Sequence, residues 1–325
     1  MKKKTTIYDI AKKLNITAAT VSRALNNNPN ISDATRELVV NMATKMNYEQ
    51  NRLALALKSG KSNNVGVVVP RIDSNFFGSV IHGIEEELNK HGYHVIICQT
   101  DGVEAKEVAN IEALLNSQVD GILISTSSNN VSTFDRIMKK EVPLVFFDRK
   151  KTMKNVSSVT INDFDGGYKA TKHLIDTGCK RIAYFSGDTN IEIFKDRFLG
   201  YKQALEDNNV EFVKEYIVQT KSTIEEGRKA VKKLLKLATP PDAIFSSSDF
   251  AALGAIQELK AKNIKIPTDF SVIGFSNEPF TMFMELSIST IDQFPLEMGR
   301  MTAKVFLEQV NNSDKIKIEK KVVLE

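Results

Sequence analysis

The side chains best suited to recognition chemistry lie near the N-terminus, in a short run of small, hydroxyl and basic residues. The Arg23 guanidinium can bond O6 and N7 of one guanine together, and the hydroxyls of Thr20 and Ser22 can bond phosphates or bases. Alanine methyl groups can contact a thymine methyl. Side chains of these types at the start of a second short helix are typical of a surface that meets base edges in the major groove. The candidate surface comprises Thr17, Ala18, Ala19, Thr20, Ser22 and Arg23.

Three short helices are predicted to position this surface. Thr6 is expected to cap the first in a capping-box arrangement with Asp9, and Asn15 tolerates the left-handed conformation that ends it. Thr17 and Ser32 would cap the second and third helices. A surface helix-loop-helix with no role on DNA remains the alternative. Helical spacing predicts that the inward-facing side chains are Ile7, Ile10, Ala11 and Leu14, then Val21, Ala24 and Leu25, then Leu38, Met42 and Met46.

Charge is distributed unevenly along the chain. The first 60 residues hold ten basic and four acidic side chains, whereas the whole chain of 325 residues has a net charge of only +4. An excess of six positive charges in one small segment indicates a polyanionic partner. A solvated basic face without a partner is the alternative interpretation.

From Val65 onward the pattern changes to apolar runs that alternate with helix-prone segments. Such alternation is typical of parallel sheets covered by helices, and two successive sets of runs indicate two lobes. Residues 315–324 form a final alternating run, which is typical of an edge strand. The other predicted strands are Val65–Val69, Val95–Cys98, Gly121–Ile124, Leu144–Phe147, Arg181–Phe185, Asp242–Phe245 and Phe270–Gly274.

No motif for catalysis, metal binding or cofactor binding has the residue spacing that it requires. The run Gly60-Lys61-Ser62 resembles the end of a P-loop, but Leu55 stands where that motif needs a glycine. The four histidines have no zinc spacing with the two cysteines, and no Gly-x-Ser-x-Gly elbow occurs. We therefore expect no metal, no cofactor and no enzymatic activity.

The cysteines and the N-terminus bear on the compartment. Cys98 and Cys179 are isolated beside apolar residues, which predicts buried free thiols in a reducing cytosol rather than a disulfide framework. No apolar stretch follows the basic start at Met1, and no apolar run approaches the length of a membrane span. We expect a cytoplasmic protein without a membrane partner.

The chain opens with the runs Ile7-Tyr-Asp-Ile-Ala-Lys-Lys13 and Ala19-Thr-Val-Ser-Arg-Ala-Leu-Asn26. These runs resemble the DNA-binding domain of the lactose-repressor/galactose-repressor (LacI/GalR) family. Shorter motifs extend the resemblance over essentially the whole chain. They are Asn51–Gly60, Val65–Pro70, Asn75–Phe77, Val119–Ile122, Phe147–Arg149, Arg197–Tyr201, Ser248–Asp249, Val272–Phe275 and Glu297–Gly299.

The resemblance implies an all-α domain and an α/β core joined by a hinge. An N-terminal all-α helix-turn-helix domain would occupy residues 1–48, and a hinge helix or linker would occupy residues 49–62. Residues 63–325 would form an α/β core of two parallel-sheet lobes, of the type I periplasmic-binding-protein-like class, that binds effector and dimerises. Its N-lobe is expected at about 63–161 and 293–318, and its C-lobe at about 162–292 together with the C-terminal strand.

The resemblance also implies the residues that contact DNA. Ala18 and Ala19 would occupy variable specificity positions, and Leu57 in the hinge would be a wedge inserted into the minor groove, partly unstacking a base step. Without the resemblance, Leu57 would be interpreted as an ordinary linker leucine. The implied DNA-binding set is Thr6, Tyr8, Thr17, Ala18, Ala19, Thr20, Ser22, Arg23, Asn26, Asn51, Ala54 and Leu57.

An effector pocket is implied between the lobes, at the carboxyl ends of parallel strands. Arg197 is the foremost candidate because its guanidinium fork can hold hydroxyls, carboxylate or phosphate; a surface ion pair is the alternative. The chain departs from the family pattern at Ser276, where an aspartate is usual, and at Ser248, where an asparagine is usual. The implied effector-binding set is Phe76, Phe77, Asp148, Asp163, Arg197, Ser248, Ser276 and Gln293.

The function predicted from these features is a transcriptional repressor that binds palindromic operator DNA as a homodimer. Its DNA affinity would be controlled by a small-molecule effector, a sugar or sugar derivative. No leucine heptads follow the last predicted strand, so a dimer is expected rather than a tetramer held by a coiled coil. A small-molecule binding protein without regulatory output, a solute-binding protein for uptake and an enzyme acting on a sugar-like substrate are the alternatives.

Overall fold

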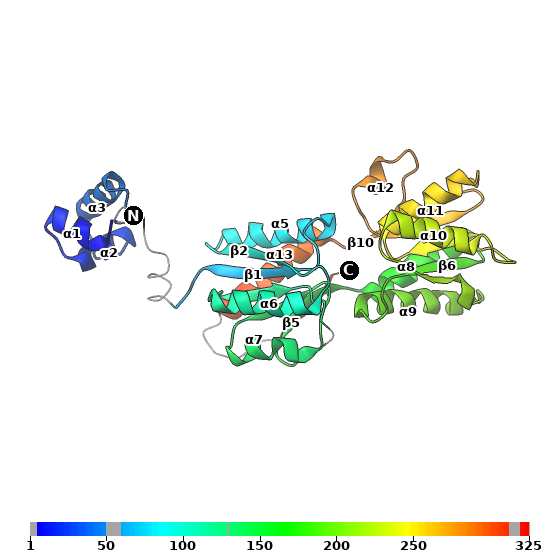
Figure 1. The fold of residues 1–325 in the computed structure, drawn as a ribbon, viewed down its shortest axis with the longest axis horizontal. Coiled ribbons are helices and arrows are strands. Elements are labelled where there is room, and N and C mark those ends of the chain that lie inside the picture. The colour runs from blue at the N-terminus through cyan, green and yellow to red at the C-terminus, as the bar shows by residue number, and fades with distance from the viewer. Residues whose placement is uncertain (1–4, 50–59, 129, 312–318, 325) are drawn as a thin grey trace. The chain divides into compact units, whose positions relative to one another are not determined.

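The structure is a computed structural model that describes residues 5–49, 60–128, 130–311 and 319–324. The chain divides into two compact units, Met1–Ser62 and Asn63–Glu325, and each is described by itself (Figure 1).

The described part of the first unit contains the three expected helices, α1 (Ile7–Leu14), α2 (Ala18–Leu25) and α3 (Asp33–Lys45). Thr6 and Asp9 form the predicted capping box on α1, and Asn15 ends that helix with a φ of 53°. The side chains of Thr17 and Ser32 accept hydrogen bonds from the backbone N–H groups of Thr20 and Thr35. The predicted caps are therefore confirmed, and they set the angle at which α2 leaves the turn.

The core of this unit joins Ile10, Val21 and Val39, all fully buried. The prediction for Leu38 is wrong, because its side chain is 60% exposed. Its neighbour Val39 faces the core instead, with Ala43 one turn later, so the predicted inner stripe of α3 is displaced by one residue at its start.

The second unit is built on two parallel sheets. The first sheet has the order β11-β5-β4-β3-β1-β2, and we call it and its helices the N-lobe. Val65, Val67 and Val69 point into one core with α5 and α13, and Val68 points into the other with α6. The strands are β1 (Asn64–Val69), β2 (His94–Gln99), β3 (Gly121–Ile124), β4 (Leu144–Phe147), β5 (Ser157–Ile161) and β11 (Lys321–Leu324). The helices are α5 (Asn75–Asn89), α6 (Glu104–Asn116), α7 (Asp135–Lys139) and α13 (Pro295–Asn311).

The second sheet has the order β10-β9-β8-β6-β7, and we call it and its helices the C-lobe. Ala183 and Phe185 point into one core with α10, and Tyr184 points into the other with α8 and α9. The strands are β6 (Ile182–Ser186), β7 (Ile217–Gln219), β8 (Ala243–Ser246), β9 (Ser271–Ser276) and β10 (Ser289–Asp292). The helices are α8 (Asp163–Asp176), α9 (Glu192–Asp207), α10 (Ile224–Leu234), α11 (Asp249–Ala261) and α12 (Phe280–Phe283).

The C-terminal strand corrects the predicted division of the lobes. We expected it in the C-lobe, but β11 pairs in parallel with β5, with Val322 opposite Val159 and Leu324 opposite Ile161. Val322 and Leu324 also pack on the N-lobe core. An alternating edge strand adds to whichever sheet edge offers free backbone groups, and here that edge is β5 of the N-lobe.

Helices α8 and α9 cross at unusually close range, and this crossing positions the site described below. A Cβ added at Gly167 would overlap the carbonyl oxygen of Arg197, and one added at Gly200 would overlap the carbonyl oxygen of Phe164. The two glycines therefore let the helix backbones touch. The contact brings the middle of α9 against the start of α8.

Cys98 and Cys179 are free thiols, but both are partly exposed rather than buried as expected. No helix within the described residues is long and apolar enough to cross a membrane.

Candidate functional site

The exposed face of α2 carries most of the residues predicted to contact DNA. Thr17, Ala19, Arg23 and Asn26 are exposed, while Ala18, Thr20 and Ser22 are partly exposed. Within the described residues the Arg23 side chain makes no hydrogen bond or ion pair, so its guanidinium is free to meet an acceptor outside the chain. In contrast, the Thr17 hydroxyl is already engaged with Thr20, at 2.9 Å between the two Oγ1 atoms.

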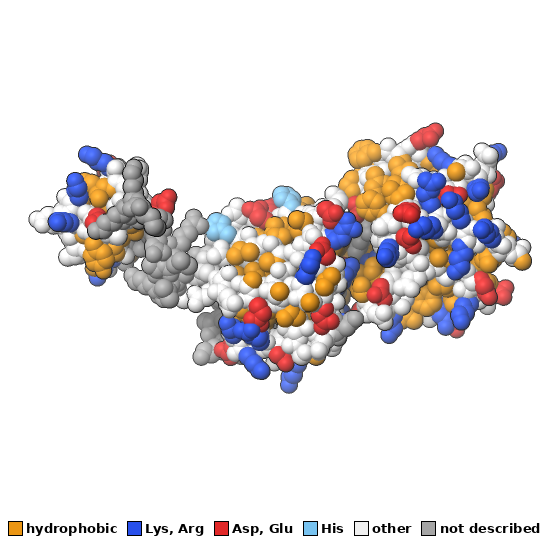
Figure 2. Space-filling view, viewed as in Figure 1, with side chains coloured by type: hydrophobic (Ala, Val, Ile, Leu, Met, Phe, Trp, Pro, Cys, Tyr) orange, Lys and Arg blue, Asp and Glu red, His pale blue; other side chains and the backbone are white. Residues whose placement is uncertain are grey.

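Helix α1 contributes a second exposed region. Tyr8 is 72% exposed on its surface, and Thr6 is exposed at its cap. The Thr6 hydroxyl donates to Asp9 at 2.7 Å, so the cap occupies it. Figure 2 shows Lys and Arg side chains projecting from the surface of this unit.

Arg36 is a basic residue of this unit that serves the fold. Its guanidinium donates to Asp33 at 2.6 Å and to the carbonyl oxygens of Asn28 and Ile31 at 3.2 Å each. It thereby fastens the loop that follows α2 to the start of α3. The guanidinium nitrogens are therefore directed into the protein.

The predicted hinge residues Asn51, Ala54 and Leu57 lie outside the described residues. Their contact with DNA stays a prediction.

The second candidate site is a cavity of about 520 Å³ in the second unit. Its wall contains Asp148 directly after β4, Ser248 shortly after β8, and Ser276 at the end of β9. These are carboxyl ends of parallel strands from both lobes, where a site is expected in open α/β sheets. Of the predicted effector residues, those on the wall are Phe76, Phe77, Asp148, Arg197, Ser248, Ser276 and Gln293.

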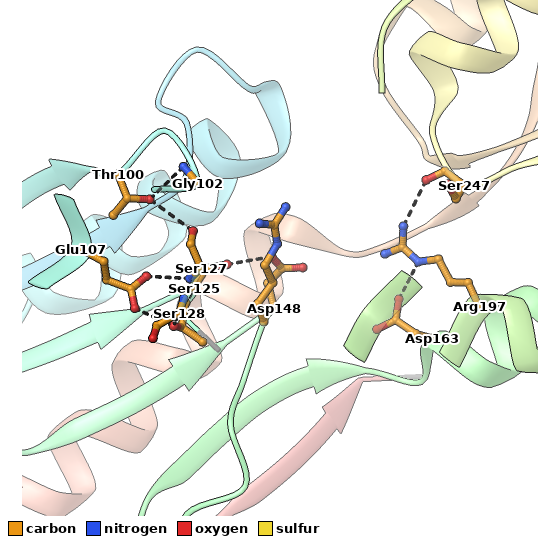
Figure 3. A network of polar contacts seen from close by, with 12 residues as sticks. Thr100, Gly102, Glu107, Ser125, Ser127, Ser128, Asp148, Asp163, Arg197 and Ser247 are labelled. Carbon is orange, nitrogen blue, oxygen red and sulfur yellow. Dashed lines mark hydrogen bonds and ion pairs between the residues drawn. The ribbon is translucent and has the colours of Figure 1, made fainter. Parts of the chain in front are cut away.

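Arg197 is anchored from three sides, although it reaches the cavity wall. Its Nε donates to Oδ1 of Asp163 at 2.8 Å, and its Nη1 donates to the carbonyl oxygen of Ser247 at 3.2 Å (Figure 3). The guanidinium carbon lies 3.6 Å from the centre of the Phe275 ring, a cation–π contact. The side chain is only 3% exposed, so the alternative of a surface ion pair is wrong.

Asp163 is the one predicted effector residue that is not on the cavity wall. It is 6% exposed at the first position of α8, and burial raises the pKa of Asp163 to about 6 while the charge of Arg197 opposes the increase. Its position behind Arg197 makes it a residue that orients the guanidinium rather than one that touches a ligand in the cavity.

Asp148 and Arg149 form the N-lobe side of the site. The hydroxyl of Ser125 donates to Oδ2 of Asp148 at 2.8 Å, and Nε of Arg149 lies 3.8 Å from the same oxygen. Burial raises the pKa of Asp148 and lowers the pKa of Arg149. Arg149 Nε is buried without a hydrogen-bond partner, and the residue lines the cavity. An acceptor on a ligand is the kind of group that could use the remaining nitrogens of this arginine.

A fully buried carboxylate, Glu107 on α6, supports this side from behind (Figure 3). It accepts the Thr126 hydroxyl at 2.7 Å and the Ser127 N–H at 2.6 Å. Burial raises the pKa of Glu107. The two hydrogen bonds fix the loop after β3, from which Ser125 reaches Asp148.

The apolar wall is formed by Phe76 and Phe77 at the start of α5, whose rings meet edge to face with centroids 5.0 Å apart. Both side chains are less than 10% exposed, so each offers the cavity only part of its ring. Gln293 follows β10 and is 4% exposed. The site thus combines aromatic edges with buried polar groups, as small-molecule sites do.

Several wall residues were not predicted from the sequence. The main ones are Arg71, Asp73, Arg149, Phe250 and Glu278. Arg149 and Glu278 each lie within two residues of a predicted site residue, directly after a strand end. That position is the signal that could have identified them. Within the described residues, no group of histidine, cysteine and acidic side chains could hold a metal ion.

Comparisons with known proteins match both units. Residues 6–51 match the family of bacterial regulatory proteins of the lacI type, and residues 62–324 match the family described as periplasmic binding proteins and sugar binding domain of the LacI family. The HTH-type transcriptional regulator DegA of Bacillus subtilis is 35% identical, over 99% of this chain and 95% of its own. The HTH-type transcriptional repressor PurR of Mannheimia succiniciproducens is 31% identical, over 95% of this chain and 93% of its own.

A solved structure of a LacI family transcriptional regulator from Enterococcus faecium, with bound ribose, is 28% identical to this chain. The superposition has a TM-score of 0.72 and covers 80% of this chain and 94% of that one. On the strength of both family matches, the chain belongs to the LacI family of bacterial regulatory proteins.

Proposed function

We propose that this protein is a transcriptional repressor that binds palindromic operator DNA through α2, and that a sugar or sugar derivative in the cavity of the second unit controls its DNA affinity. The observation that carries the proposal is the presence of both parts in one chain. A capped recognition helix with a free arginine precedes a core with a polar, aromatic-lined cavity.

The DNA-binding role is supported by the surface of α2. Arg23 and Ala19 are exposed on one helix whose buried side is anchored by Val21 and Ala24. The helix is short, so one copy would read few base pairs. Two copies on a palindrome would multiply the affinity, as in other helix-turn-helix dimers.

A homodimer is supported by an exposed apolar patch on the C-lobe. Met282 and Phe283 on α12 are 65% and 83% exposed, and Phe250 on α11, which is 39% exposed, packs against the Phe280 ring of α12. Figure 2 shows hydrophobic side chains gathered over α11 and α12. Apolar patches of this kind are typical of surfaces that another protein covers.

A sugar-like effector is supported by the chemistry of the wall. Arginine nitrogens and carboxylate oxygens provide the donors and acceptors that hydroxyl groups need, and aromatic edges suit the apolar faces of a sugar ring. The ribose in the related Enterococcus faecium structure agrees with this class of ligand. Because the proposed repressor would act on DNA, we place the protein in the cytoplasm.

The test of this function begins with selection of DNA from a random pool by the purified full chain. We expect a palindromic sequence to be enriched and to bind more tightly than random DNA by at least about a thousandfold. Addition of the cognate sugar should change that affinity by about 5- to 150-fold. If a sugar bound in the cavity but no DNA sequence were preferred, the protein would instead be a small-molecule binding protein without regulatory output.

A further inference from the structure

Glu278 is a pocket residue whose backbone is fixed independently of its side chain. It follows β9, is 6% exposed and lines the cavity. Its N–H donates to Oδ2 of Asp249 at 2.8 Å, and its carbonyl oxygen accepts the N–H and the hydroxyl of Thr281 at 2.9 and 2.8 Å. The carboxylate is therefore not required to hold the loop in place.

The loop before Glu278 is held equally firmly. Ser276 and Asn277 both have positive φ values, 125° and 54°, which turn the chain sharply after β9. The Asn277 N–H donates to the Thr290 hydroxyl at 3.2 Å, and its side-chain amide donates to Asp292 at 2.9 Å. The carboxylate that follows this strand end is therefore that of Glu278, whereas Ser276 offers only a hydroxyl group.

The side chain of Glu278 has no partner among the described residues. It makes no hydrogen bond or ion pair with them, although it is more than nine-tenths buried. Burial and the nearby charge of Asp249 both raise the pKa of Glu278, and no cation acts against them. An unpaired carboxylate in a largely buried residue of the cavity wall is a group that a ligand of opposite charge can pair with.

The other charged side chains on the wall do not compensate this charge. Arg71 is bonded twice to Asp73, at 2.9 and 2.7 Å, and Arg197 is bonded to Asp163. Glu225 is 3.0 Å from Lys229, and Arg149 is 3.8 Å from Asp148. After these pairings, Glu278 is the wall charge left without an opposite charge within the described residues.

We propose that the effector carries a protonated amine, as an amino sugar does, and that the amine pairs with the Glu278 carboxylate. The inference rests on the proposed function, because it names the chemical class of that effector. A neutral hydroxyl could donate a hydrogen bond to Glu278 but would leave its negative charge uncompensated. An ammonium group supplies both the donor and the opposite charge.

The test measures binding to the full chain by calorimetry for matched pairs of sugars. The pairs are glucosamine with glucose, galactosamine with galactose and mannosamine with mannose, and N-acetylglucosamine serves as the uncharged derivative. We expect one amine to bind at least about tenfold more tightly than its neutral parent. For that pair, Glu278→Gln should reduce the preference for the amine to less than about twofold, because glutamine keeps a hydrogen-bond acceptor but loses the charge.

Glu285→Gln is the matched control, since Glu285 is 92% exposed and lies outside the cavity wall. It should leave every affinity unchanged. Glu278→Ser is a second variant of smaller volume, and a thermal unfolding midpoint checks that both Glu278 variants are folded. The inference is overturned if none of the amines binds more tightly than its parent, or if the preference survives in both variants.

These outcomes are separate from failure of the proposed function. A neutral sugar that shifts operator affinity, together with an unaltered Glu278→Gln protein, would retain the repressor and reject the amine. Loss of all sequence preference on DNA would reject the repressor itself.

Discussion

The Nε of Arg197 donates to Oδ1 of Asp163 across 2.8 Å, joining the second turn of α9 to the first residue of α8. Both side chains are more than nine-tenths buried, and only the arginine reaches the cavity wall. The ion pair therefore holds Arg197 in place for ligand binding and also contributes to the buried core. Its two roles can be separated by measurement.

Arg197→Ala should abolish effector binding and destabilise the second unit. The change leaves Asp163 buried without its cation, which we expect to cost about 3–5 kcal/mol of unfolding free energy. Arg181→Ala is the matched control, because the Arg181–Asp242 pair is largely at the surface, with the arginine side chain 46% exposed. Urea unfolding of both variants checks the contrast; equal losses would show that burial of the pair is unimportant.

The pH dependence of the free energy of unfolding should reflect the titration of Asp163. Its pKa is raised to about 6 in the folded protein from an unfolded value of 3.8, so between these values the folded state binds more protons than the unfolded state. Stability from this group is thus greatest at low pH and is lost as pH rises through about 6. The free energy of unfolding of wild type minus that of Asp163→Asn should fall by up to about 3 kcal/mol from pH 4 to 7. A difference that rises with pH would contradict this assignment.

Gly200→Ala should disturb the α8–α9 crossing. The added methyl group would overlap the carbonyl oxygen of Phe164, and the helices would have to separate. We expect a loss of about 1–3 kcal/mol of unfolding free energy and weaker effector binding, because Arg197 lies on the displaced helix. Calorimetry and denaturant unfolding measure the two effects.

Gly78→Ala provides the opposite expectation. Gly78 is exposed within α5, and an added Cβ would meet nothing within 4 Å. The substitution should stabilise the protein by up to about 1 kcal/mol, because alanine is the better helix former. If both glycine variants were destabilised equally, close helix contact would not explain the Gly200 result.

Arg23→Ala should weaken binding to the selected palindrome by about 1–3 kcal/mol per half-site and relax the base preference at one position. Effector affinity should be unchanged, since Arg23 belongs to the first unit. Lys45→Ala, at the exposed end of α3, is the control and should retain the base preference. Competition between matched and altered palindromes measures the outcome; an unaltered preference in Arg23→Ala would remove α2 from base recognition.

Features governed by local rules were predictable from the sequence. The caps at Thr6, Thr17 and Ser32 were predictable because each hydroxyl group can accept a hydrogen bond from the backbone N–H three residues later. The strands were predictable as apolar runs because the sheet is buried on both faces. Strands β5, β7 and β10 were missed. Serines begin β5 and β10 and obscure the apolar pattern, and β7 is only three residues long. Hydroxyl residues are tolerated there because they pair with other polar groups, as Ser157 does with Gln309 at 2.8 Å.

Features governed by tertiary contacts were not predictable in the same way. Leu38 was wrongly predicted to face inward. In a short helix, a single exposed apolar residue can fit the helical spacing and shift the predicted buried face by one position. The partner of β11 depends on which sheet edge is free, a property of the assembled lobes. The position of Glu278 two residues after a strand end could have marked it as a site residue, but nothing in the sequence showed that its carboxylate would lack a partner. Its importance comes from the turn at Ser276 and Asn277 and from the absence of a partner among described residues.

Arg36 has a consequence for how the protein would respond to salt. Its Nη1 and Nη2 nitrogens donate to Asp33 and to two backbone carbonyl groups, and its Nε is buried, so it has little to offer a phosphate. A basic residue that forms no phosphate contact releases no condensed counterion when DNA binds. The dependence of log K on log salt should accordingly correspond to fewer released ions than the ten basic side chains of the first 60 residues imply. A count of basic side chains therefore overstates the electrostatic contribution of this unit to DNA binding.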